Sequence, residues 1–266
     1  SDISFRALHM LSNSDYVAGE DTRSVRSLFK LLKISKSIKS IISYHDHSSA
    51  HTRGKIIELI KQGKSVALVS DAGTPLISDP GYKLVKNTIE EGFEVFSVPG
   101  PSSVIAALTV SGLPTDTFSF LGFLPNTKSK KKKLLETYLN LGSSLIIFES
   151  GKRLQKTLEL LAETCRPSTE ICICRELTKL NEEITRFKAQ EGIKVTKKMR
   201  SLKGEFVILV GKNEAGDFDL KNLDEQLRKL KKSTSMKGSV DFLAERLNIP
   251  KKIIYKKALT IFKDNN

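Results

Sequence analysis

The chain has 266 residues, 39% of them hydrophobic, so it can fill the cores of two ordinary domains and is not expected to be disordered. Its 44 Lys and Arg residues against 30 Asp and Glu residues give a formal net charge of +14, which favours an anionic partner, nucleic acid before a membrane surface. There is no apolar run of membrane-spanning length, no signal peptide and no zinc pattern around the three cysteines, and we expect a cytoplasmic protein. Lysine enrichment from an A+T-rich genome is the alternative source of the charge.

Short apolar runs alternate with stretches of helical period from Tyr16 to about Gly211, which predicts α/β units with largely buried strands. A helix is predicted to begin with Asp79 as its N-cap and Pro80 in its first turn, and to end at Gly92. A second helix is predicted at Val104–Ser111. The predicted strands are Ser65–Ser70, Phe93–Val98, Ser144–Phe148 and Glu205–Val210.

The pattern breaks at residues 123–127, just before the basic run Lys128–Lys133, and again after Gly211. We therefore predict a first domain at 1–124, a second at 125–215 and a basic helical region at 216–266. Residues 221–266 hold 12 Lys and Arg residues and 5 Asp and Glu residues. Here Ser239 is predicted to cap one helix, Asn248 and Ile249 to form a turn, and Pro250 to begin another helix. The two helices form either a helix-turn-helix or a hairpin that packs on the body or on a second subunit.

Two loops rich in small residues follow predicted strands, SDAGTPLISDPG at Ser70–Gly81 and VPGPSS at Val98–Ser103. Open α/β sheets bind ligands at the C-terminal ends of their strands, and small residues let a ligand approach the backbone. The loops are therefore predicted to converge on one site for a nucleotide-like cofactor, the alternative being two ordinary tight turns. Neither GxGxxG after a strand nor GxxxxGK[ST] is present.

Together with GEDTR (Gly19–Arg23), FLP (Phe123–Pro125), FESGKR (Phe148–Arg153), RELTK (Arg175–Lys179) and KGE (Lys203–Glu205), these loops resemble the bacterial ribosomal RNA small subunit methyltransferase I family, part of the tetrapyrrole methylase superfamily. The seven motifs cover nearly the whole chain in the family's order.

The resemblance implies a two-domain α/β tetrapyrrole-methylase-like fold, with a small C-terminal helix-turn-helix-like region and S-adenosylmethionine bound in a cleft between the domains. It also implies 2′-O-methylation of a cytidine in 16S ribosomal RNA, the small ribosomal subunit as partner, no membrane partner, and a homodimer. The cofactor-binding residues that it implies are Asp71, Ala72, Gly73, Thr74, Pro75, Ser102, Ser103, Phe148, Gly204 and Glu205.

Members of the family begin with an apolar strand and a TPIGNL-like loop, and Ser1–Leu8 corresponds to the helix that follows this loop. We expect a sheet without that strand to be incomplete and the cofactor cleft to lack one wall.

Methyl transfer from a sulfonium to a ribose oxygen is an in-line displacement, in which the protein aligns the two groups and accommodates the hydroxyl proton; no metal is required. The candidate catalytic residues are Glu20, Asp21, Arg23, Glu149 and Glu176. The candidate RNA-binding residues are Arg153, Arg175, Lys179, Lys130, Lys131 and Lys132. A helix cap at Asp21, an ion pair between strands for Arg175 and Glu176, and a solvated helix face for the lysines are the alternatives. His45, His47 and His51 lie close in sequence, but their spacing is common by chance and we predict no metal site.

Two other functions compete with RNA methylation. One is a tetrapyrrole methyltransferase of the precorrin type, which would have no obvious use for a basic helical tail. The other is a non-catalytic RNA-binding ribosome assembly factor. A tetrapyrrole methyltransferase is not expected to show the salt-sensitive RNA binding of an RNA methyltransferase. An assembly factor is expected to bind RNA in this way but not to bind S-adenosylmethionine.

Overall fold

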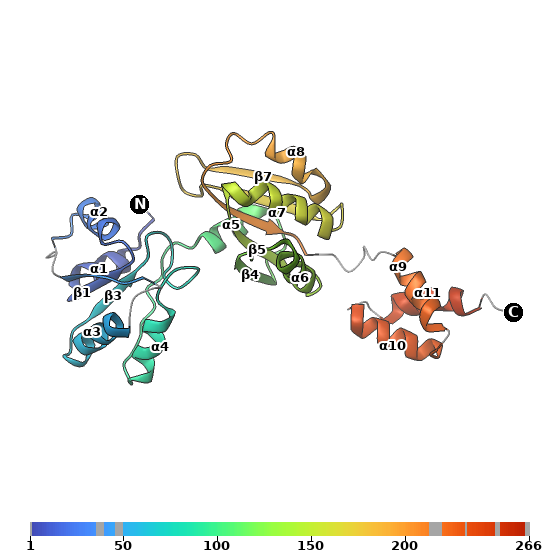
Figure 1. Ribbon diagram of the computed structural model, residues 1–266, viewed down its shortest axis with the longest axis horizontal. Helices are drawn as coiled ribbons and strands as arrows, with labels where there is room; N and C mark the ends of the chain where they lie inside the picture. The colour runs from blue at the N-terminus through green and yellow to red at the C-terminus, as the bar shows by residue number, and fades with distance from the viewer. Residues whose placement is uncertain are drawn as a thin grey trace. The chain divides into compact units, whose positions relative to one another are not determined.

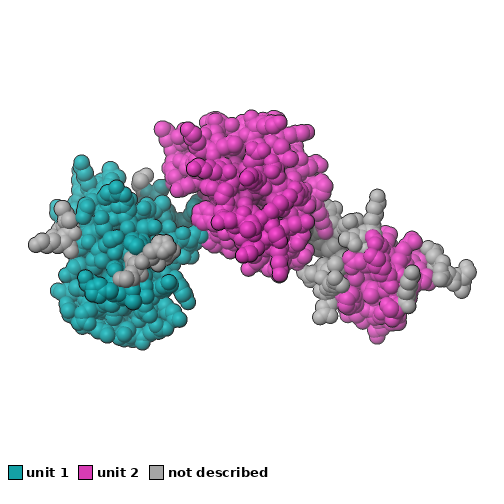
Figure 2. Space-filling model, in the orientation of Figure 1, with its two compact units in different colours: residues 1–106 teal, residues 107–266 magenta. Residues whose placement is uncertain are grey.

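The computed structural model describes residues 2–35, 40–45, 50–212, 220–231, 233–247 and 251–263. The chain divides into two compact units, Ser1–Ala106 and Ala107–Asn266, coloured separately in Figure 2. The division falls inside helix α5 (Ser103–Ser111), whereas the predicted domain boundary lies after residue 124. Residues 118–123 form a strand of the second unit's sheet, which explains the difference. The predicted boundary between residues 215 and 216 lies outside the described residues.

The first unit is built around a parallel three-stranded sheet with the order β2-β1-β3 (Figure 1). Successive strand residues face opposite sides of a sheet. Accordingly, Val17 packs with α1 and α2, while Ala18 packs with α3 and α4. The elements are α1 (Phe5–Asn13), β1 (Tyr16–Gly19), α2 (Thr22–Leu32), β2 (Ile41–Ser43), α3 (Ala50–Lys61), β3 (Val66–Val69) and α4 (Tyr82–Glu90). The predicted strand at Ser65–Ser70 is confirmed as β3.

The predicted strand at Phe93–Val98 is wrong. In the described part of the chain these residues join no sheet, and the Phe96 side chain is 74% exposed. An apolar run predicts burial, but a strand also needs a neighbour for its N–H and C=O groups. In this unit β3 forms its ladder with β1.

Helix α4 begins at Tyr82, with Gly81 at the N-cap position, so the predicted N-cap at Asp79 is wrong. The physical reason lies at Gly81, which would be the second residue of a helix capped by Asp79 but has a φ of 139° that does not fit a helix. Gly92 has a φ of 82° just beyond the C-cap Glu91, which confirms the predicted end of the helix.

The second unit contains a mixed five-stranded sheet with the order β4-β5-β8-β6-β7. Alternate residues of its central strands, among them Ile147, Ile173 and Ile208, pack against Leu135 of α6 and Leu158 of α7. Its elements are β4 (Phe118–Phe123), α6 (Lys128–Leu139), β5 (Ser144–Ser150), α7 (Gly151–Thr164), β6 (Glu170–Arg175), β7 (Glu183–Lys188), the 3₁₀ helix η2 (Ala189–Glu191), α8 (Gly192–Thr196) and β8 (Glu205–Val210). The predicted strands at Ser144–Phe148 and Glu205–Val210 are confirmed.

The C-terminal region forms three helices, α9 (Leu220–Lys231), α10 (Met236–Leu247) and α11 (Lys251–Lys263). The predicted cap at Ser239 is wrong, because Ser239 is buried inside α10. Instead, Ser235 Oγ accepts a hydrogen bond from Gly238 N–H at 3.2 Å, as an N-cap does. The two serines lie one helical turn apart, so the local pattern fits both. The predicted turn at Asn248 and Ile249 and the predicted start at Pro250 lie outside the described residues.

None of the helices in the described ranges combines the length and apolar character that a bilayer crossing requires.

Candidate functional site

The two predicted small-residue loops meet in the first unit. Thr74 Oγ1 donates a hydrogen bond to the Pro101 carbonyl at 2.8 Å, and Ser4 Oγ donates to the Pro99 carbonyl at 2.8 Å. Ser70 Oγ donates to the Ala72 carbonyl at 3.1 Å, within its own loop. The hydrogen bonds therefore hold the two loops together beside the C-terminal end of β3, as expected from the sequence, and a cofactor site there stays a prediction.

The loop surface that this arrangement presents consists of small and polar groups. Asp71, Ala72, Gly73 and Thr74 are exposed, as is Ser103, while Pro75 and Ser102 are half-buried. A Cβ atom on Gly73 would meet nothing closer than the Pro101 carbonyl at 4.0 Å, so the backbone there is open to a ligand. The positive φ angles of Leu76 and Ser78 add strain of the kind that gathers at binding loops.

Asp21 and Arg23 follow β1, whose C-terminal end lies beside that of β3 because the strands are parallel. Asp21 caps α2 by accepting the Arg23 N–H at 2.8 Å, and its Oδ2 lies 2.7 Å from Arg23 Nη2. The Arg23 hydrogen bonds lower the pKa of Asp21 to about 2. The predicted alternative, a helix cap at Asp21, is thus present, and the carboxylate is a weak base.

Arg23 nevertheless remains available to a ligand. Its side chain is 85% exposed, and Asp21 holds only the Nε and Nη2 edge of the guanidinium. Its pKa is raised chiefly by Asp21, with a smaller contribution from the charge of Asp71, so the segments after β1 and β3 share one electrostatic environment. Glu20, beside them, is exposed.

In the second unit, Glu149 at the end of β5 is not placed as a base. Its side chain is 0% exposed and accepts hydrogen bonds from Thr157 Oγ1 at 2.6 Å and from its neighbour's backbone N–H at 2.9 Å. Arg153 Nε lies 3.0 Å from Glu149 Oε1, and Lys131 Nζ lies 3.9 Å from Oε2. These contacts make Glu149 the centre of a polar cluster, which we call the Glu149 cluster, and its catalytic role stays a prediction.

The same cluster changes the interpretation of the basic run. Lys131 is buried, and burial lowers the pKa of its ammonium, only partly offset by Glu149. Lys131 is therefore engaged inside the cluster, whereas Lys130 and Lys132 are exposed, and the RNA contacts of all three stay predictions. Arg153 also donates from Nη1 to Asn126 Oδ1 and from Nη2 to the Leu124 carbonyl, so these two groups hold the segment between β4 and α6.

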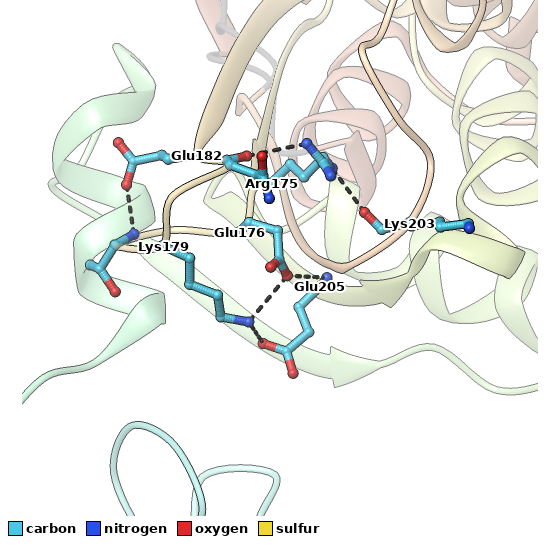
Figure 3. A network of polar contacts seen from close by, with 8 residues as sticks. Arg175, Glu176, Lys179, Glu182, Lys203 and Glu205 are labelled. Atoms are coloured by element: carbon cyan, nitrogen blue, oxygen red, sulfur yellow. Dashed lines mark hydrogen bonds and ion pairs between the residues drawn. The ribbon is translucent and has the colours of Figure 1, made fainter. Parts of the chain in front are cut away.

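Glu176 and Lys179 lie in a second polar cluster (Figure 3). Glu176 Oε1 accepts the Glu205 N–H at 2.9 Å and lies 3.1 Å from Lys179 Nζ, which in turn lies 2.9 Å from Glu205 Oε2. The Glu205 N–H and then Lys179 lower the pKa of Glu176. This arrangement, the Glu176 clamp, neutralises Lys179 and leaves Glu176 a weak base.

Gly204 completes the clamp, because its φ is 113° and a Cβ there would lie 2.7 Å from Glu176 Oε1. Arg175 is buried and donates to the Lys203 carbonyl at 2.8 Å and to the Asn181 carbonyl at 3.2 Å. The guanidinium is thus engaged by backbone carbonyls, and its predicted phosphate contact stays a prediction. Arg175 Nη1 also lies 3.8 Å from Glu183 of β7, so the ion pair between strands involves Glu183 and not Glu176.

Phe148 of β5 lies in an aromatic group, its ring centroid 4.8 Å from that of Phe120 and 5.7 Å from that of Phe123. Its role toward a cofactor stays a prediction, as do those of Gly204 and Glu205. Of the three histidines, His47 lies outside the described residues.

Three polar partners were missed from the sequence. Thr157 supports Glu149, Asn126 holds Arg153, and Glu182 Oε2 accepts the Thr178 N–H at 2.6 Å. Thr157 and Asn126 carry no local signal, because their partners are distant in sequence. Glu182 lies only four residues after Thr178, a β-branched residue with a φ of 65°. A carboxylate at this short distance is a recognisable candidate to accept a backbone N–H of the turn.

Residues 1–192 match the family model described as Tetrapyrrole (Corrin/Porphyrin) Methylases. A protein of Rickettsia prowazekii named "Ribosomal RNA small subunit methyltransferase I" is 41% identical over 263 residues, 99% of this chain and 87% of that protein. A protein of the same name from Hydrogenobaculum sp. is 42% identical over 211 residues, 79% of this chain and 90% of that protein.

Solved structures show the same fold at low sequence identity. Diphthine synthase matches with a TM-score of 0.61 at 14% identity, covering 79% of this chain and 84% of its own. A cobalamin biosynthetic enzyme, cobalt precorrin-4 methyltransferase, matches with a TM-score of 0.57 at 18% identity, covering 79% and 89%.

Proposed function

Because the chain belongs to the tetrapyrrole methylases and, within them, to the ribosomal RNA small subunit methyltransferase I family, we propose that it methylates the 2′-hydroxyl of a cytidine in 16S ribosomal RNA, with S-adenosylmethionine as methyl donor. The observation that carries this proposal is 41% identity across 99% of the chain to a protein named for that RNA substrate. Relatives of this kind do not favour the precorrin alternative, because the precorrin-4 enzyme shares only the fold at 18% identity.

The joined loops of the first unit fit the proposed cofactor. S-adenosylmethionine carries cationic, hydroxyl and aromatic groups and supplies an electrophilic methyl group. The exposed carboxylate of Asp71 matches a cation, the Ser102 and Ser103 hydroxyls match polar groups, and the open backbone at Gly73 admits a close approach. Phe148, Gly204 and Glu205 are proposed as further cofactor contacts.

Alignment of donor and acceptor is the main demand of an in-line displacement. Arg23 is suited to hold an RNA phosphate, because Asp21 fixes one edge of its guanidinium and its other donors face outward. Among the predicted proton acceptors, Asp21, Glu149 and Glu176 are engaged in caps, clusters or clamps. Glu20 is exposed, and we propose that it accepts or orients the hydroxyl proton.

We propose that exposed lysines contact RNA phosphates away from the reacting groups. Lys130 and Lys132 on α6 lie where they can contact phosphates without reading sequence. The 16S target, the cytoplasmic location and the homodimer implied by the resemblance remain part of this proposal.

Transfer of labelled methyl from S-adenosylmethionine to small ribosomal subunits tests the proposal. Subunits from cells that lack this gene provide unmodified substrate, and digestion of the RNA to nucleosides identifies the product. Label in 2′-O-methylcytidine is expected. Label in a small tetrapyrrole, or cofactor binding without transfer to RNA, would contradict the proposed substrate, and absence of cofactor binding would favour a non-catalytic factor.

A further inference from the structure

The C-terminal helices bury their apolar faces against one another. Leu223 and Leu227 of α9, Val240 and Leu243 of α10, and Ile254 of α11 belong to one buried cluster. Ala258 and Ile261 of α11 complete it. Helix α9 therefore covers the apolar faces of the two helices expected from the sequence. These faces are buried within the three-helix bundle itself.

Several cations at the edges of this bundle are engaged internally. Lys251 Nζ lies 2.6 Å from Asp241 Oδ1, and Lys257 Nζ lies 3.0 Å from Asp224 Oδ2. Lys231 Nζ donates to the Ile261 carbonyl at 2.7 Å, close to the C-terminal end of α11. These contacts hold the helices together, so their charges are at least partly neutralised.

The outer face of α11 is different. Lys252, Tyr255, Lys256 and Leu259 are spaced three and four residues apart, which places them on one side of the helix, opposite the buried Ile254, Ala258 and Ile261. Lys252 and Lys256 are exposed, Tyr255 is 46% exposed, and Leu259 is half-buried. Within the described ranges, no carboxylate lies within ion-pair distance of either lysine. Helix α11 has five lysines and no acidic residue.

We propose that this α11 face, defined by Lys252, Tyr255, Lys256 and Leu259, binds single-stranded RNA, with Tyr255 stacking on an unpaired base and the two lysines contacting the flanking phosphates. The proposal rests on the proposed function for the choice of RNA. An aromatic ring between cations is the combination by which proteins hold single strands with little sequence preference. The two lysines lie four residues apart, about 6 Å along the helix axis, which suits successive phosphates of one strand.

Binding of the full chain to a single-stranded oligoribonucleotide and to a duplex of equal length, each over a range of salt concentrations, tests this inference. Tyr255→Ala is expected to weaken single-strand binding roughly tenfold, Tyr255→Phe to retain it, and the duplex to be affected less. Lys252→Gln with Lys256→Gln should flatten the slope of log affinity against log salt by about 0.7 for each lost contact. Lys229→Gln is the matched control, because Lys229 is an exposed lysine of the same bundle already paired with Glu225 at 2.8 Å.

Unchanged single-strand affinity in Tyr255→Ala, with thermal unfolding showing a folded protein, would overturn the inference. So would loss of self-association in that variant at constant RNA affinity, because the face would then join two copies of the chain. The oligonucleotide assay needs no cofactor and no methyl transfer, so it separates this inference from the proposed function. If the protein binds RNA through the α11 face but transfers no methyl group, the proposed methyltransferase function is overturned and the inference about α11 stands.

Discussion

Acidic and basic residues follow strands in both units, but their surroundings differ. In the first unit, the Arg23 side chain is 85% exposed, and the loop residues Asp71 to Thr74 are exposed beside it. In the second, the Glu149 side chain is 0% exposed, and Glu176 is held by Glu205 and Lys179. Similar residue types at strand ends are therefore exposed in one unit and engaged in internal support in the other.

Removal of the Glu149 carboxylate is the strongest way to test the second half of this contrast. Glu149→Ala leaves Lys131 buried without its anionic partner, and we expect a loss of about 3–5 kcal/mol in the free energy of unfolding. Denaturant titration measures it. Glu136→Gln, which removes an exposed carboxylate of α6 that lies 3.9 Å from Lys132, should change stability by less than about 0.5 kcal/mol. Equal effects of the two substitutions would contradict a supporting role for the Glu149 cluster.

Gly204 in the second unit and Gly73 in the first both have positive φ angles, so the same substitution at each position compares the packing of the two units. Gly204→Ala places a Cβ 2.7 Å from Glu176 Oε1 at a φ of 113°, so we expect a stability loss of about 1–3 kcal/mol. Gly73→Ala at a φ of 71° meets no atom nearer than 4.0 Å and should cost about 1 kcal/mol. Thermal unfolding of both variants compares them, and a larger loss for Gly73→Ala would reverse the contrast.

Arg23 tests whether the exposed group of the first unit acts on the RNA. Arg23→Gln is expected to lower kcat/KM for small ribosomal subunits by roughly tenfold or more, with cofactor affinity retained, because a charge-assisted phosphate contact is lost. Arg23→Lys should recover only part of the loss, since lysine lacks the guanidinium fork. A full recovery would show that charge alone suffices, and an unchanged kcat/KM in Arg23→Gln would exclude the contact.

Asp21 provides the smallest effect. Its pKa in the folded protein is lowered from 3.8 to about 2, so its contribution to stability is fully present above about pH 5 and is lost as the pH falls toward 2. Wild type should therefore lose stability relative to Asp21→Asn over this range, and the two should run parallel above pH 5. Acid unfolding curves measure the difference, and parallel curves throughout would show that the cap does not titrate in this way.

The sequence predicts those elements whose local pattern and tertiary setting agree. The strand at Glu205–Val210 is apolar and has neighbours on both sides, whereas Phe93–Val98 is apolar but joins no sheet among the described residues. Ser235 and Ser239 fit the same cap pattern, and only the packing of α10 decides between them.

The site residues, too, are predictable from the sequence only where the signal is local. The loops around Asp71 and Pro101 are recognisable from their small residues, because an open backbone leaves a local signal. The burial of Lys131 leaves none, because it depends on Glu149 and Thr157, which are far away in sequence. A run of lysines is therefore a poor guide to which of them is exposed.

Calorimetric binding of S-adenosylmethionine to Asp71→Asn and Glu176→Gln, measured side by side, tests the contrast between the units most directly. Both substitutions remove one negative charge from a strand-end carboxylate that the sequence assigned to the site. We expect at least a tenfold loss of affinity for Asp71→Asn, because a charged contact is removed. We expect little change for Glu176→Gln, because the glutamine amide oxygen can still accept the Glu205 N–H and hold the backbone at Gly204 and Glu205 in place. Loss of affinity in Glu176→Gln with full affinity in Asp71→Asn would contradict this contrast.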